Sequence, residues 1–580
     1  MPLTIAIIGS GPRGLSALEN IFQSQANSSI KTSINVLLFE KTEQLGCGFI
    51  YRSNQPDSNW LNISERALTL AERPKIQGNA LEIEAFPSYH QWTGKTKDDI
   101  LNNNHEVFPK RSEMGQYLRE RYDSIASALK PLGLLTVINS EVHDITSNEE
   151  DFTILTNTEE KHSADEVVLT IGHQNTKLSK QLETWANYAE NHPGIKLFTN
   201  PYPIKPILEV DFKNVSHRVG IRGFGLAMID LVRAITTASG GVFEITDELT
   251  HKMVYKRGRK KLKLIPFSLD GLPMACKPLN AQVDALFTPP EAKLLAFKYD
   301  LLRVRDDENY DNGNRFLIEA FATIASHQFL SLKNKAYKHQ FSTHELKMII
   351  NNYLKDADFS HALMLSKKQA PEKIIQSFID MATAFKPISL DYCIGQVWRH
   401  CEPIIYKMMS HSNLKDDVIS EVIKLDERMK RYAFGPPIES LQQLLALTYE
   451  GTLDLIFVNN PKITSTTKGW LMEKDTQKAC VNVMINSVLD SPQIIKVTSK
   501  IVTNLLEDRV IQPIHNQLGV KTQPNGLVIS KNSKQTLHLA LLGRLAKGSI
   551  VGVDAILECF GSRVKDWADG VIERHGNNAK

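Results

Sequence analysis

The sequence lacks the features that mark secreted, disulfide-bonded or membrane proteins. Its six cysteines are scattered and form no CxxC pair, so a disulfide framework is not expected. No apolar run is long enough for a transmembrane helix. The chain enters an apolar strand within a few residues of its start, which leaves no room for a signal peptide. We therefore expect a cytoplasmic protein with no membrane partner.

The sequence also lacks a large excess of charge of one sign. The formal net charge is only +3 over 580 residues, too little to indicate a nucleic-acid partner. No group of His, Cys, Asp and Glu has metal-ligand spacing, so no metal is predicted. No nucleophile, base and acid form a triad-like pattern, so the catalytic residues stay unknown, as does the oligomeric state. Arg399, on a predicted helix, could bind a substrate carboxylate or form a surface salt bridge.

The most informative stretch that is present lies at the start of the chain. Residues 5–8 are an apolar run suited to a buried parallel strand. A G-x-G-x-x-G turn follows, and helical spacing begins at Leu15. The turn consists of Gly9, Ser10, Gly11, Pro12, Arg13 and Gly14. A second apolar run, residues 36–39, ends at Glu40.

Each part of this pattern has a physical role in binding a dinucleotide. Gly9 allows the tight turn, Gly11 lets a phosphate approach the backbone, and Gly14 lets the helix pack against the strand. The helix N-terminus offers unpaired N–H groups to a pyrophosphate. Glu40 can accept hydrogen bonds from a ribose diol. The alternative is a glycine turn in an ordinary α/β domain.

The opening pattern partly recurs at residues 218–230. A short strand leads into Gly223 and Gly225 and then into a helix, but Met228 stands at the third glycine position. A bulkier residue there pushes the helix away from the strand, which is compatible with NADP-type sites. We expect a second nucleotide site here, with a simple packing turn as the alternative.

A basic run follows this second unit. A 2′-phosphate needs a cationic partner, and arginine can bind it with two parallel hydrogen bonds. Lys256, Arg257 and Arg259 are therefore candidates to select NADPH over NADH. The alternative is a solvated basic loop.

The chain divides by pattern into four stretches within an α/β fold class that carries a large helical insertion. Residues 1–215 predict the first part of a Rossmann-like domain, and residues 216–287 a second Rossmann-like region. Residues 288–432 have helical spacing almost throughout, which indicates an inserted cover over the substrate. Residues 433–580 return to α/β character.

These motifs together resemble the two-dinucleotide-binding flavoproteins, specifically the bacterial FAD/NAD(P)-binding family related to N-hydroxylating flavin monooxygenases. The resemblance covers most of the chain. The segments that carry it are residues 9–14, 60–63, 108–117, 170–173, 434–437 and 543–548.

The resemblance implies where the cofactors bind. FAD would lie on residues 9–14 with Glu40 at the adenosine ribose, and NADPH on the second turn. Asn62 and Arg111 would lie near the flavin or the nicotinamide. Gly172 would mark the crossover near the adenine, and Gly543 with its helix would approach the flavin ring.

The resemblance also implies an activity. The chain would be an FAD-dependent, NADPH-consuming monooxygenase that uses oxygen to N-hydroxylate a small amine or amino acid through a flavin C4a-hydroperoxide. A reductase or oxidase without oxygen transfer is the first alternative. A non-catalytic FAD-binding protein that senses redox state or binds a partner is the second.

Overall fold

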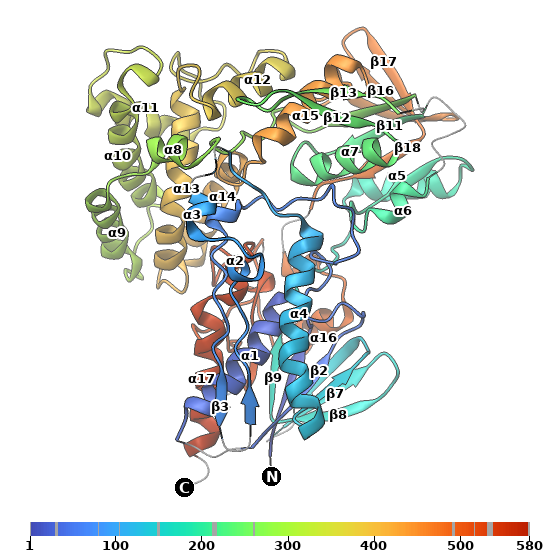
Figure 1. The fold of residues 1–580 in the computed structure, drawn as a ribbon, viewed down its shortest axis with the longest axis vertical. Helices are drawn as coiled ribbons and strands as arrows, with labels where there is room; N and C mark the ends of the chain where they lie inside the picture. The colour runs from blue at the N-terminus through green and yellow to red at the C-terminus, as the bar shows by residue number, and fades with distance from the viewer. Residues whose placement is uncertain are drawn as a thin grey trace.

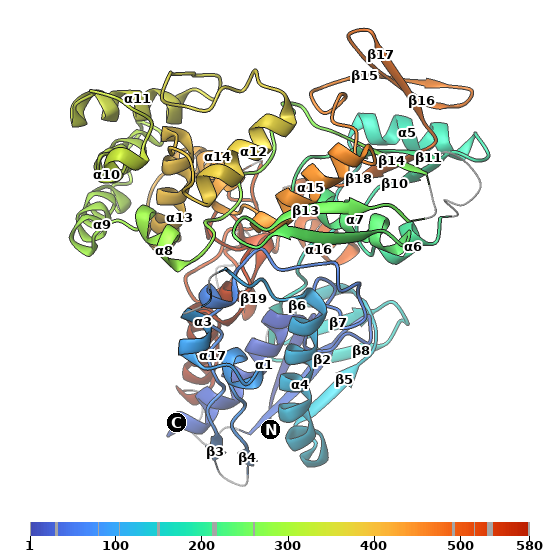
Figure 2. The same cartoon turned by 45° about the horizontal axis from the view of Figure 1, so that its top comes forward.

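The computed structural model places three structural regions around a common junction. It describes residues 2–29, 33–78, 81–101, 103, 105–147, 151–210, 217–258, 261–489, 493–515, 517–530 and 537–577. In Figure 1 the first sheet and both chain ends lie below, a helical region lies at the upper left and a second sheet at the upper right. Figure 2 shows the helical region and the second sheet above the first sheet in a tilted view.

The first sheet is parallel and has five strands in the order β19-β9-β1-β2-β5. Its strands are β1 (Leu3–Ile8), β2 (Ile34–Phe39), β5 (Leu135–Ile138), β9 (Glu166–Leu169) and β19 (Leu539–Leu541). Its helices include α1 (Pro12–Asn27), α4 (Arg111–Leu129) and α17 (Ser562–Asn577). The inner strands are almost entirely apolar because both faces of the sheet are buried, one by α1, α4 and α17 and the other by residues 142–147, 151–164 and 501–511.

Smaller elements surround this sheet. They are the hairpin β3 (Ile76–Gly78) and β4 (Leu81–Ile83), the short helices α2 (Tyr89–Trp92) and α3 (Lys97–Leu101), the antiparallel β6 (Val142–Ser147), β7 (Phe152–Thr156) and β8 (Lys161–Ala164), and α16 (Lys500–Glu507). The strands β6, β7 and β8 form a sheet of their own and do not join the parallel one.

The second sheet is also parallel, with four strands in the order β10-β18-β11-β14. These are β10 (Lys196–Phe198), β11 (His217–Arg222), β14 (Leu262–Phe267) and β18 (Val483–Asn486). Around it lie α5 (Lys180–Glu190), α6 (Lys205–Leu208), α7 (Leu226–Ala238), the hairpin β12 (Val242–Asp247) and β13 (Lys252–Lys256), and the antiparallel β15 (Lys462–Thr466), β16 (Gly469–Lys474) and β17 (Gln477–Val481). Residues 180–198 thus belong with the second sheet, ahead of the boundary predicted at residue 215.

The helical region runs between the strand β14 and the strand β15. Its helices are α8 (Ala281–Asp284), α9 (Glu291–Arg305), α10 (Arg315–Ser331), α11 (Thr343–Lys355), α12 (Pro371–Ala382), α13 (Leu390–Met409), α14 (Asp416–Ala433) and α15 (Ile438–Glu450). One continuous hydrophobic core joins these helices to α7 and to the second sheet. Among the described residues, no helix combines the length and the apolar character needed to cross a bilayer.

A buried ion-pair group fixes α1 against α4. Arg121 donates to both oxygens of Glu19 at 2.8 Å, and Arg73 donates to one of them at 3.4 Å. All three side chains are less than 5% exposed. One carboxylate therefore balances two buried guanidinium groups.

Replacing that carboxylate is expected to destabilise the first region strongly. Glu19→Gln leaves two buried cations without a counter-charge, which costs about 3–5 kcal/mol of unfolding free energy. Urea unfolding followed by limited proteolysis of the first region measures the loss. Glu141→Gln, which breaks only the exposed pair with Lys41, is the control and should cost less than about 1 kcal/mol. Equal stability of the two variants would contradict this account.

Candidate functional site

The first glycine turn joins the end of β1 to the start of α1. Gly9 has φ +103°, and its N–H donates to the Phe39 carbonyl at 2.9 Å. A Cβ on Gly14 would lie 2.0 Å from the Gly9 carbonyl oxygen, so only glycine allows this approach of the helix to the strand. The unpaired N–H groups of the first turn of α1 therefore lie at the C-terminal edge of the sheet.

Gly11 leaves room that the protein itself does not use. It precedes α1 with φ −71°, a conformation open to any residue. An added Cβ would meet nothing closer than the Gly48 Cα at 3.8 Å. Space beside a helix N-terminus is what a diphosphate needs to reach the backbone N–H groups.

Glu40 lies behind this turn, at the end of β2. The Ser10 N–H donates to its Oε2 at 2.9 Å, and the Thr42 N–H and hydroxyl donate to its Oε1 at 3.0 and 2.8 Å. A carboxylate has about four lone-pair positions, so Glu40 can accept further hydrogen bonds from a diol. Its side chain is partly exposed, as such a contact requires.

Arg13 and Arg563 bring two buried guanidinium groups to the same turn. Arg13 is 8% exposed, and its Nε and Nη2 find no acceptor among the described residues, nor does Nη1 of Arg563. Burial, and then the charge of Arg13, lower the pKa of Arg563 to about 10. Glu558 lies near both cations. Two guanidinium groups beside one carboxylate favour a further anion, so this site fits a diphosphate.

Two further predicted glycines lie at the same edge of the first sheet. Gly172 follows β9 with φ +66°, and no heavy atom lies within 4 Å of the position of an added Cβ. Gly543 follows β19 with φ +122°, and its added Cβ would lie 2.7 Å from Nη1 of Arg13. The structure therefore brings Gly543 directly beside the first turn, through a strand that arrives from the far end of the chain.

Arg111 and Asn62 lie at the contact between the first region and α7. Arg111 pairs with Asp230 at 3.0 Å, and Asp230 also accepts from the Tyr202 hydroxyl at 2.6 Å. Arg233 lies 4.0 Å from the centre of the Trp60 ring. These contacts fasten α7 to the first region.

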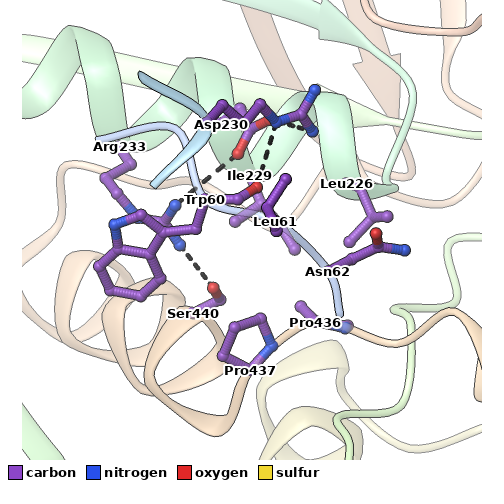
Figure 3. A pocket seen from close by; sticks show the side chains of 11 residues that line it. Trp60, Leu61, Asn62, Leu226, Ile229, Asp230, Arg233, Pro436, Pro437 and Ser440 are labelled. Atoms are coloured by element: carbon purple, nitrogen blue, oxygen red, sulfur yellow. Dashed lines mark hydrogen bonds and ion pairs between the residues drawn. The ribbon is translucent and has the colours of Figure 1, made fainter. Parts of the chain in front are cut away.

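A pocket of about 10 Å³ remains beside this contact, enough for about one water molecule. Figure 3 shows Asn62, Leu226, Asp230, Arg233, Pro436 and Ser440 around it. The pocket is too small for a nicotinamide ring in this conformation. Arg111 thus acts here as an ion-pair partner between regions.

The second glycine turn has the same construction as the first. Gly223 has φ +122° and its N–H donates to the Phe267 carbonyl at 2.7 Å. Gly225 precedes α7, and an added Cβ would meet nothing closer than the Met274 Sδ at 3.8 Å. Met228 is buried in the core, one turn into the helix. This helix N-terminus can also receive a phosphate group.

The basic run does not lie beside this second turn, which corrects the role predicted for Arg257. The strand that pairs with β11 after α7 is β14, and His217 is opposite Leu262 while Arg222 is opposite Phe267. Lys256 and Arg257 precede Leu262, so they lie at the N-terminal edge of the sheet, roughly 20 Å from the turn over six residues of strand. Arg257 instead pairs with Glu450 at 2.6 Å. Arg259 lies outside the described residues.

A polar cluster that the sequence did not reveal lies next to Asn62. Lys277 donates to the Asn62 carbonyl, and Arg399 pairs with Asp284. Glu402 follows Arg399 by one turn of α13 and is 7% exposed. The spacing of Arg399 and Glu402 on one helix was the only available signal, because Lys277 comes from a distant loop.

One group of potential metal ligands lies at the opposite edge of the first sheet. Glu166, His538 and His575 place ligand atoms within 4.8 Å of one another. Arg574 donates to both oxygens of Glu166 at 2.9 Å, so the carboxylate already has a cationic partner. The prediction that the chain has no metal stays a prediction.

Two parallel sheets, each with a glycine turn at a helix N-terminus, define a fold with two Rossmann-like dinucleotide-binding domains. The family model described as FAD-NAD(P)-binding matches residues 6–174. The predicted resemblance to FAD- and NAD(P)-binding proteins is confirmed at this level.

Known proteins similar to this chain come from bacteria and a fungus. L-aspartate N-monooxygenase (nitrosuccinate-forming) of Streptomyces davaonensis is 22% identical over 302 residues, 48% of this chain and 45% of that protein. Nitrosuccinic acid synthase npaA of Aspergillus oryzae is 24% identical over 284 residues, 48% of this chain and 42% of that protein. The match thus spans less than half the length of these curated relatives.

A solved structure with a similar arrangement is the reduced form of ornithine hydroxylase (PvdA) from Pseudomonas aeruginosa. It is 10% identical, with 99% of this chain and 100% of that chain covered, at a TM-score of 0.46.

The two turn glycines Gly11 and Gly14 are expected to fail in different ways. Gly11→Ala should fold normally but bind FAD about 10–100-fold more weakly, because a methyl group in a filled contact costs about 1–3 kcal/mol. Gly14→Ala should instead lower stability, because its Cβ clashes with the backbone of Gly9. Fluorescence titration with FAD and thermal unfolding separate the two effects.

The control is Gly78→Ala in β3, where an added Cβ meets only Ala26 at 3.6 Å. It should change neither quantity. Unaltered FAD affinity in Gly11→Ala would show that the diphosphate does not approach this turn.

Proposed function

We propose that this chain is an FAD-dependent, NADPH-consuming monooxygenase that N-hydroxylates a small amine or amino acid. The observation that carries the proposal is the first glycine turn. It lies within the stretch that matches the FAD-NAD(P)-binding family, Gly11 leaves space there, and two nitrogen atoms of Arg13 have no hydrogen-bond acceptor among the described residues. Because two relatives are named for acting on L-aspartate or forming nitrosuccinic acid, L-aspartate is the first compound to test.

In this proposal the C-terminal edge of the first sheet would hold FAD. The N-terminus of α1 and Arg13 would hold its diphosphate, Glu40 would accept from its ribose diol, and Gly543 would lie on the side of its flavin. When bound, FAD supplies the hydride acceptor and the oxygen chemistry. The chain supplies the anion contacts and, through the helical region, a cover against water.

NADPH is proposed to bind the second turn at Gly223 and Gly225. A 2′-phosphate on this turn would lie beyond the end of β14, where Asp270 follows the strand. Arg431 of α14 pairs with Asp270 there, with 28% of its side chain exposed. Arg431 therefore replaces the basic run as the candidate partner of the 2′-phosphate.

Arg431→Gln is expected to raise KM for NADPH about 10–100-fold, because a charged hydrogen bond contributes about 1.5–3 kcal/mol. KM for NADH should change little, since NADH carries no 2′-phosphate. Arg257→Gln is the matched control and should change neither value. Initial-rate kinetics with both donors tests this, and a selective effect of Arg257→Gln would contradict the assignment.

The proposed activity predicts two separable observations. NADPH should bleach the flavin absorbance of the FAD-loaded protein without oxygen. Admission of oxygen with L-aspartate or another amine should then give N-hydroxylated product, detected by mass spectrometry, with little hydrogen peroxide.

Each other outcome contradicts part of the proposal. Reduction followed by quantitative peroxide with every amine would identify a reductase or oxidase. An FAD-loaded protein that neither nicotinamide donor reduces would identify a non-catalytic FAD-binding protein.

A further inference from the structure

Glu402 is a buried carboxyl group that lacks a hydrogen-bond donor. It lies on α13 and is 7% exposed, and no described residue donates to its Oε1. Burial, and then the charge of Asp426, raise its pKa to about 8, against the opposing charges of Lys430, Lys277 and Arg399. A buried polar atom without a partner costs free energy, so its retention indicates that a donor arrives with a ligand.

Lys277 lies in the loop that leads from β14 to α8, and it is electrostatically coupled to Glu402. Its ammonium donates to the Asn62 carbonyl, and the residue is partly exposed. Burial, and then the charge of Arg399, lower its pKa to about 7. Glu402, Glu106 and Asp284 oppose both effects, and an anion bound beside Lys277 would oppose them further.

Arg399 is held in place by a network around Asp284. The Asp284 carboxylate accepts from Arg66 at 2.8 Å and from Arg399, and its other neighbour His400 lies at 3.1 Å. Burial alone would raise the pKa of Asp284. The hydrogen bond from His400 and the charge of Arg399 nevertheless hold this pKa well below its usual range.

The cluster carries as many negative as positive charges when Glu402 is ionised. Its cations are Lys277, Arg66 and Arg399, and its anions are Asp284, Glu106 and Glu402. These residues come from the first region, from the loop after β14 and from α13. They thus meet at the junction of the three regions.

We propose that Lys277 and Glu402 bind the substrate, an amino acid whose carboxylate lies on the Lys277 ammonium and whose amino group lies on Glu402. This inference rests on the proposed function and names its substrate class. A zwitterionic amino acid keeps this charge balance, because its carboxylate pairs with the Lys277 ammonium and its own ammonium supplies the donor that Oε1 of Glu402 lacks.

Glu402 then has a second role, because N-oxygenation needs the lone pair of a neutral amine. A proton passes from the substrate ammonium to a carboxylate oxygen of Glu402, which leaves a neutral amine and a neutral carboxylic acid. Burial, which raises the pKa of Glu402 to about 8, favours this neutral pair over the ion pair.

Binding to the wild-type protein provides the first test and needs no substitution. Isothermal titration calorimetry of the FAD-loaded protein without NADPH is run with the twenty common amino acids, beginning with L-aspartate. For the tightest binder, the analogue without the amino group and the analogue without the α-carboxylate are titrated next; for L-aspartate these are succinate and β-alanine. Each should bind at least about tenfold more weakly, since each loses one charged contact.

Two near-isosteric variants provide the second test. Glu402→Gln should weaken the amino acid about 10–100-fold but leave the analogue without an amino group unaffected. Lys277→Met should weaken the amino acid equally but spare the analogue without the carboxylate. Glu291→Gln and Lys293→Met, on exposed positions of α9, are the matched controls and should bind as the wild type does.

The outcomes separate this inference from the proposed function. The inference is overturned if none of the amino acids binds, or if the two analogues bind as tightly as the amino acid itself. It is also overturned if the folded Glu402 and Lys277 variants bind the amino acid as tightly as the wild type does. Hydroxylation of amines that carry no carboxylate, with no amino-acid binding, would overturn it while preserving the monooxygenase activity. Absence of flavin reduction would overturn only the activity. Should a variant misfold by circular dichroism, the analogue comparison decides.

Discussion

The close approach of α1 to β1 is the contact on which the proposed cofactor site depends. The missing side chain of Gly14 lets the helix begin directly over the Gly9 carbonyl. That approach sets the direction of the helix N-terminus and carries Arg13 to the end of β19, against Gly543. It also places the Ser10 N–H on Glu40. Anion contacts and the acceptor for a diol thus follow from one backbone contact.

The first turn could be predicted because its determinants are local. The apolar run, the glycines of the turn and the helix that follows all lie within one βαβ unit. The spacing of these residues along the sequence is enough to identify the unit. The strand order could not be predicted in the same way. β19 joins the first sheet, and β18 enters the second sheet between β10 and β11, both from the last hundred residues of the chain. Such three-residue and four-residue strands depend on neighbours that are remote in sequence, and their own pattern is too short to identify them.

The error about the basic run has a specific physical cause. In a simple βαβ unit, residues that follow the helix lead into the next strand and then return to the ligand edge. Here the hairpin of β12 and β13 intervenes, so the basic residues precede β14 and do not follow it. The positive charge of these residues and their place after the second glycine turn were predicted correctly. The edge of the second sheet at which they lie was not. The loop that follows β14 carries Asp270 to the ligand edge and then continues to Lys277, which links the two proposed sites.

The buried carboxylates of the chain differ in how fully they are supplied with partners. Glu19 is surrounded by its own partners, and so is the Asp230 carboxylate. Arg13 at the first turn and Glu402 on α13, by contrast, each hold buried polar atoms without a hydrogen-bond partner. Such atoms cost free energy unless a ligand supplies the missing partner. No single segment carries this signal, because Lys277 comes from the loop after β14 and Glu402 from α13, more than a hundred residues later.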